Sequence, residues 1–157
     1  MREVSDDSSG AIQGLSRPIP QKFPIRIGPR SRLFLRAFFG VREDNAYVTL
    51  DGDLDARFGW YRLRTPMSNI VSWRIEGPWL WITAIGMRTS IRHRDVTFGG
   101  NQTGGVRIDF KEPVRFLFYH VPALYVTVAD LDGLAAALRE RGFDGVDTRE
   151  GVAASGS

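Results

Sequence analysis

The stretch YVTLDGDLDARF, residues 47–58, decides the fold class of this chain. Apolar residues alternate with polar ones on both sides of the Asp-Gly pair at 51–52, the pattern of two strands that each bury one face. Asp-Gly is a strong short-range hairpin signal, because glycine supplies the positive φ of a tight turn without strain. The stretch therefore predicts a β-hairpin.

The same alternation continues along the chain. Further strands are predicted at 60–64, 70–75, 96–98, 106–110, 114–118 and 124–128, and the largely apolar 79–85 has the character of an interior strand. Short strands separated by turns at fairly regular intervals predict a mainly β fold, either a sandwich or a small barrel.

One helix is predicted at 130–142, near the end of the folded unit. Asp130 can cap its first turn, and Gly142 follows its last. Four apolar residues form a stripe at helical spacing: Leu131, Leu134, Ala135 and Leu138. This helix is expected to close over one end of the sheet. Residues 31–39 could form a second helix that ends at Gly40, or equally an edge strand.

The composition describes one globular domain: 157 residues, 43% of them apolar. Residues 1–22 are expected to be a disordered N-terminal segment, 23–143 a single domain and 144–157 a flexible tail. The absence of cysteine excludes disulfides, thiolate metal sites and cysteine nucleophiles.

Neither a targeting segment nor a membrane span is predicted. The first ten residues lack an apolar core, and the longest uncharged stretch, 116–129, is shorter than the ~20 residues of a spanning helix. The sequence therefore predicts a cytoplasmic protein and leaves open a peripheral association with a membrane.

The charges are unevenly distributed, although 21 basic and 18 acidic residues give a net charge of only +3. No acidic residue lies between Ser8 and Arg42, and between Arg57 and Arg94 seven arginines accompany the single acid Glu76. The candidate binding face consists of arginines with neighbouring tryptophans: Arg62, Arg64, Arg74, Trp79, Trp81, Arg88, Arg92 and Arg94. Such a face suits an acidic protein segment, an anionic membrane or single-stranded nucleic acid. The alternative is solvated arginines around core tryptophans.

Residues about 44–142 resemble a bacterial pleckstrin-homology-like (PH-like) domain, and also small actinobacterial proteins. The resemblance rests on a first hairpin and on strand 124–128 running directly into a terminal amphipathic helix. Four dipeptides between strands also carry it: Phe58-Gly59, Thr65-Pro66, Asn69-Ile70 and Gly77-Pro78. It implies a bent antiparallel sheet or small barrel of about seven or more strands, capped by a C-terminal helix, in a fold used mainly to bind lipids, peptides or proteins.

The first hairpin departs from the pattern of the phosphoinositide-binding members of that family. Those members use lysine and arginine there, whereas residues 43–56 contain only acidic charges. An acidic turn repels a phosphorylated headgroup, so phosphoinositide binding at the usual site is not expected.

Motifs for catalysis and for metal or phosphate binding are absent from the sequence. The two histidines, His93 and His120, are too few for a self-contained histidine metal site, and no cofactor is expected. Binding is thus favoured over catalysis, although a hydrolase or transferase that pairs either histidine with Asp95 or Asp109 stays open.

Two functions remain at this point. The first is a non-catalytic interaction module that recruits an unknown protein partner, or another anionic ligand, through the arginine-rich face. The second is a binder of a small ligand, a lipid or an anionic membrane surface. The small ligand or lipid would bind in a pocket lined by Trp60, Trp73, Trp79 and Trp81. A membrane surface would be contacted by the segment 31–39. Edge strands leave a homodimer open.

Overall fold

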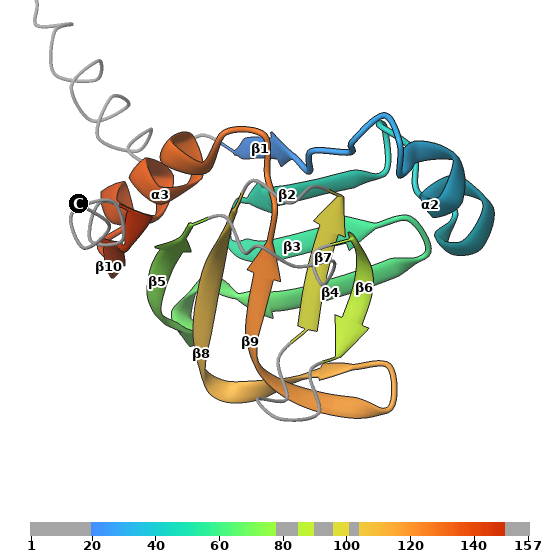
Figure 1. The fold of residues 1–157 in the computed structure, drawn as a ribbon. Helices are drawn as coiled ribbons and strands as arrows, with labels where there is room; N and C mark the ends of the chain where they lie inside the picture. Colours follow the sequence, from blue (N-terminus) through green and yellow to red (C-terminus); the bar gives the residue numbers. More distant parts are fainter. Residues whose placement is uncertain (1–19, 78–84, 90–95, 101–103, 150–157) are drawn as a thin grey trace, which may run out of the picture.

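The computed structural model describes residues 20–77, 85–89, 96–100 and 104–149. Its first sheet has four antiparallel strands in sequence order (Figure 1). These are β1 (Gln21–Pro24), β2 (Ala46–Leu50), β3 (Asp53–Phe58) and β4 (Tyr61–Pro66). Inward and outward residues alternate along β2, β3 and β4, as the sequence predicts for strands with one buried face. β1 begins inside the segment that was expected to be disordered up to residue 22.

The second sheet has six strands in the order β10-β5-β8-β9-β7-β6. Its strands are β5 (Ile70–Glu76), β6 (Ile85–Thr89), β7 (Val96–Gly100), β8 (Gly105–Phe116), β9 (Tyr119–Val126) and β10 (Asp144–Asp147). Two pairings are parallel, β10 with β5 and β7 with β9, so the sheet is mixed. The mainly β class is confirmed, but the described strands form two sheets and no closed barrel. The strand predicted at 79–85 lies outside the described residues except for Ile85.

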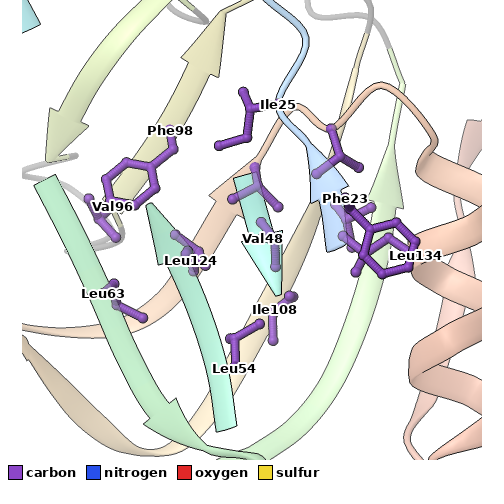
Figure 2. Close-up of a cluster of buried hydrophobic side chains, with 14 of the residues drawn as sticks. Phe23, Ile25, Val48, Leu54, Leu63, Val96, Phe98, Ile108, Leu124 and Leu134 are labelled. Atoms are coloured by element: carbon purple, nitrogen blue, oxygen red, sulfur yellow. The ribbon is translucent and has the colours of Figure 1, made fainter. Parts of the chain in front are cut away.

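The core lies between the inner faces of the two sheets. Figure 2 shows side chains of both sheets meeting there, and none of those at the centre is exposed. They include Val48, Leu54 and Leu63 of the first sheet and Ile108 and Leu124 of the second. The alternation of apolar and polar residues in the sequence therefore reflects the burial of one face of each strand between the two sheets.

Strand β8 bends sharply, and a side chain satisfies the backbone at the bend. The register between β8 and β9 shifts between Asp109 and Val114. Asn69, at the end of the short 3-10 helix η1 (Met67–Asn69), accepts a hydrogen bond from the Glu112 amide and donates one to the Glu112 carbonyl, both at 3.0 Å. The asparagine thus replaces a strand partner where the ladder is interrupted.

The C-terminal helix α3 (Leu131–Glu140) begins and ends as predicted. Asp130 Oδ1 accepts a hydrogen bond from the Gly133 amide at 2.8 Å. At the other end Gly142 has a φ of +89°, and the Phe143 amide donates to the Leu138 carbonyl at 3.1 Å. Leu134, Ala135, Ala137 and Leu138 of α3 are buried. The helix therefore completes the core at one end of the sandwich (Figure 1).

The predicted flexible tail at 144–157 is wrong at its start, because β10 and Thr148 are held on β5. The indole Nε1 of Trp73 donates to the Phe143 carbonyl at 3.0 Å, and the Thr148 hydroxyl donates to the Ile75 carbonyl at 2.7 Å. Gly145 lies so close to the Trp73 ring that a Cβ atom would overlap it. These contacts are distant in sequence, which is why local composition does not indicate them.

Residues 31–39 form a helix and not an edge strand. Helix α2 (Arg32–Phe39) ends at Gly40, whose φ of +63° is left-handed, and the Val41 amide then donates to the Leu35 carbonyl at 3.1 Å. Leu35 is fully buried. α2 lies at the end of the molecule opposite α3 (Figure 1).

The predicted hairpin at 47–58 is confirmed, but its turn is not the expected one. Leu50 pairs with Leu54, so three residues separate the paired positions, and Gly52 does not have a positive φ. The left-handed glycine is Gly59, with a φ of +63°, in the two-residue turn between β3 and β4. In this longer turn Gly52 does not need the positive φ that a two-residue turn would require.

Candidate interaction surface

Arg62 and Arg64, two members of the predicted arginine face, lie exposed on β4 and pair with aspartates of β3. Arg62 makes a two-point contact with Asp55, with Nε–Oδ1 and Nη2–Oδ2 distances of 2.8 and 2.6 Å. The hydrogen bonds that Arg62 donates to the Asp55 carboxylate raise the pKa of Arg62 above its usual value. Arg64 lies 2.7 Å from Asp53 Oδ2. Carboxylates of the neighbouring strand thus already neutralise the charge of both arginines.

The other members of that face do not join these two among the described residues. Arg74 lies on β5 of the second sheet, 3.7 Å from the Glu76 carboxylate. Arg88 belongs to β6, but the structure does not describe its side chain. Trp79, Trp81, Arg92 and Arg94 lie outside the described residues.

The two described tryptophans do not line a common pocket. Trp73 is only 1% exposed and packs between β5 and β10, whereas Trp60 is 73% exposed. The pocket expected from Trp60, Trp73, Trp79 and Trp81 is therefore not formed by Trp60 and Trp73.

Three large apolar side chains are exposed on α2 instead. Ser31, Leu35 and Phe39 recur every four residues and form the inward side of the helix. Leu33, Phe34 and Phe38 lie outside this stripe and are 78%, 49% and 65% exposed. The helix is thus apolar over most of its circumference while only one strip is buried.

Trp60 adds a fourth exposed apolar side chain next to α2. The Trp60 amide donates to the Phe39 carbonyl at 3.2 Å, and its indole lies directly over Gly40. We call Leu33, Phe34, Phe38 and Trp60 together the α2 surface. Clustered exposed apolar groups of this size mark a binding surface more often than scattered single ones do.

The charges around the α2 surface are predominantly basic. Arg32 and Arg36 are four residues apart on the helix, and like charges at this spacing repel. Arg32 pairs with Glu43 at 2.8 Å. Within the described ranges, no carboxylate forms an ion pair with Arg30, Arg36 or Arg42. These arginines remain available to an external anion.

An aromatic chain joins the α2 surface to the core. Phe34 contacts Phe39, whose ring centroid lies 6.1 Å from that of Tyr61 on β4. Tyr61 in turn lies 6.2 Å from Phe116, which is buried. Contacts of this kind hold the helix in a fixed position on the sheets.

The described part of the chain brings no catalytic or metal-binding group together. His120 is exposed on β9 opposite Arg115, and Asp109 accepts hydrogen bonds from Arg107 and Ser72. No group of three histidine or carboxylate side chains able to hold a metal lies within the described residues. His93 and Asp95, the other pair considered, fall outside them.

Comparison with family models, with curated proteins and with solved structures finds no match in any of the three. None of the described helices is long and apolar enough to span a membrane. The geometry of this chain is therefore the evidence on which its function has to be argued.

Sequence reasoning placed the binding face on β4, β5 and the segment that follows, and only partly on α2. The signal for the α2 surface is present in residues 32–39: six apolar side chains, five of them large, cannot all face inward on a helix this short. Recognising it requires knowing that the segment is a helix, which the sequence left open.

Proposed function

We propose that this protein is a non-catalytic binding module that associates with anionic membrane surfaces through the α2 surface. The observation that carries the proposal is the exposure of Leu33, Phe34, Phe38 and Trp60 beside the exposed arginines of α2. An apolar helix face with flanking basic residues lies in the plane of a membrane interface, and indole rings favour the headgroup level.

The distribution of charge along the sheet supports this orientation. The acidic turn at 51–53 and the Gly59-Trp60 turn lie at opposite ends of β3, so a strand of six residues, roughly 20 Å, separates them. The acidic end would then point away from an anionic surface. Both acids that follow α2 are exposed; Glu43 is paired with Arg32, and Asp44 forms no ion pair among the described residues.

The resemblance to a PH-like domain is part of this proposal. Four antiparallel strands and a helix that follows β9 almost directly support it, whereas the parallel pairings of β10 with β5 and of β7 with β9 depart from an all-antiparallel arrangement. Membrane association would then use α2, which precedes the first hairpin, and not the acidic hairpin itself.

The arginine face first considered for a protein partner is less well suited to an external anion. Arg62 and Arg64 are already paired with Asp55 and Asp53, so a ligand would have to displace two carboxylates. Arg36 of α2 and the neighbouring Arg30 and Arg42 form no ion pair among the described residues, so an external anion displaces no carboxylate there.

Sedimentation with vesicles tests the proposal. The protein is mixed with phosphatidylcholine vesicles with and without phosphatidylglycerol, at low and high salt. We expect binding only to the anionic vesicles, weakened by salt because exposed charges are screened. No sedimentation with anionic vesicles at low salt would overturn the proposal.

Two matched double variants identify the surface. Arg36→Gln/Arg42→Gln, which removes two exposed arginines without an ion pair, should weaken vesicle binding about 30-fold, at roughly 1 kcal/mol for each cation lost near an anionic membrane. Arg62→Gln/Arg64→Gln removes the same charge and should change binding little. The reverse ranking would assign the interaction to β4. A concentration-dependent dimer that is lost in Phe34→Ser/Phe38→Ser, without vesicle binding by the parent, would instead assign the surface to a second copy of this chain.

A further inference from the structure

The turn between β8 and β9 exposes three consecutive apolar residues. Phe116 pairs with Tyr119, which leaves Leu117 and Phe118 as a two-residue turn. Phe118 is 93% exposed, and Leu117 and Tyr119 are about half exposed. We call Leu117, Phe118 and Tyr119 the apolar tip.

The backbone of Leu117 is strained in this turn. Its φ of +54° is left-handed, and it is the only non-glycine residue with a positive φ in the described part of the chain. Asparagine or glycine adopts this conformation readily, whereas leucine does not. A strained, exposed leucine beside an exposed phenylalanine stabilises neither the turn nor the core. Local strain of this kind is concentrated at functional positions.

The apolar tip and the α2 surface belong to the same side of the molecule. Both project on the side away from α3 (Figure 1). Tyr61 connects them, because its ring contacts Phe39 of α2 and Phe116 at the base of the tip. Both features therefore lie on the side of the molecule opposite α3 (Figure 1).

The charges beside the apolar tip suit the same surface. Arg115 and His120 lie opposite each other on β8 and β9, directly behind the turn, and both are exposed. Lys111 and Glu112 are exposed farther along β8 and offset each other in charge. Arg115 is the charge closest to the apolar tip in the hairpin, and it is basic.

We infer that the apolar tip inserts into the bilayer as a second contact, so that α2 and the β8–β9 hairpin together fix how the domain sits on the membrane. This inference rests on the proposed function and names a further point of contact for the same ligand, the interfacial layer of an anionic bilayer. The aromatic contacts through Tyr61 hold the two points at a constant separation.

Site-specific labelling provides the test, because the chain contains no cysteine. An environment-sensitive fluorophore is attached in turn to Phe118→Cys, Leu33→Cys and Val146→Cys. Val146 is an exposed apolar residue of β10, beside α3 on the far side, and serves as the matched control. With vesicles containing phosphatidylglycerol, we expect a blue-shifted emission for labels at 118 and 33 and no shift at 146.

The two proposals fail in different ways in this experiment. A shift at 33 without one at 118 overturns the role of the apolar tip and leaves the proposed function intact. No shift at either position overturns both. Equal shifts at all three positions indicate non-specific adsorption and also overturn both.

An unlabelled variant measures the contribution of the tip. Phe118→Ser should weaken vesicle binding about tenfold or more, since burying a phenylalanine side chain contributes strongly to transfer from water. Val71→Ser, another exposed apolar residue, should leave binding unchanged. Equal binding by Phe118→Ser and the parent protein, with both folded by circular dichroism, contradicts insertion of the tip.

Discussion

The indole ring of Trp60 occupies the space that a side chain at Gly40 would need. A Cβ atom on residue 40 would lie 2.5 Å from two atoms of the ring, and Gly40 also has a left-handed φ of +63°. The end of α2 and the turn between β3 and β4 are therefore fitted to each other through a glycine.

Substitution of this glycine should disturb both stability and binding. We expect Gly40→Ala to lower the free energy of unfolding by about 1–2 kcal/mol, the cost of a left-handed alanine, and to weaken vesicle binding by displacing Trp60. Urea denaturation followed by circular dichroism measures the first effect. Gly52→Ala is the control: nothing lies within 4 Å of its Cβ position and its φ is not positive, so its stability should stay within about 0.5 kcal/mol of the parent.

Substitution of the two described tryptophans should lower the free energy of unfolding by very different amounts. Trp73→Phe removes the buried hydrogen bond to the Phe143 carbonyl and should cost about 1–3 kcal/mol of stability. Trp60→Phe should change stability little, because the side chain is mostly exposed. Thermal or urea unfolding compares the two. A stable Trp73→Phe protein would contradict the anchoring of β10 through this bond.

Acid should weaken the ion pair between Asp147, the last residue of β10, and Arg149. Hydrogen bonding from Arg149 lowers the pKa of Asp147 below its usual value. A carboxylate whose pKa is depressed by folding adds stability above its unfolded pKa of about 3.9, and that stability is lost as the pH falls through the folded pKa.

Asp147→Asn tests this pH dependence. The variant should be less stable than the parent at pH 7, and the difference should shrink as the pH is lowered below about 4. Urea unfolding at several pH values measures it. A difference that stays constant down to pH 2 would show that the carboxylate of Asp147 is not the group responsible.

Substitution of Leu117 should raise the stability of the protein while it weakens vesicle binding. Leu117→Asn introduces a residue that tolerates a positive φ, and it should raise the free energy of unfolding by about 0.5–1 kcal/mol. The same change removes an apolar group from the tip and should weaken vesicle binding. A less stable variant would mean that Leu117 makes packing contacts that outweigh its strain.

Local patterns in the sequence were sufficient for most of the first sheet and for α3. The alternation around Val48 and Leu54 predicts their burial because a strand that faces a core repeats every two residues. Asp130 and Gly142 define the ends of α3 because capping depends on neighbouring residues alone.

The remaining features depend on residues that are distant in the chain. β10 forms because Trp73 and Ile75, about 70 residues earlier, provide its partners. The ion pairs of Arg62 and Arg64 require the register of β3 and β4, which composition does not reveal. The sequence predicts a strand at 114–118 that includes Leu117 and Phe118, because the apolar run at 116–119 contains no typical turn residue.

The short strand β10 also determines where this chain can be shortened. It covers one edge of β5 and so occupies backbone groups that would otherwise be open to another strand. A protein that ends at residue 143, the boundary suggested by the sequence, would uncover this edge beside Trp73. Such a truncation is expected to self-associate through β5, whereas one that retains residues up to 149 keeps the edge covered.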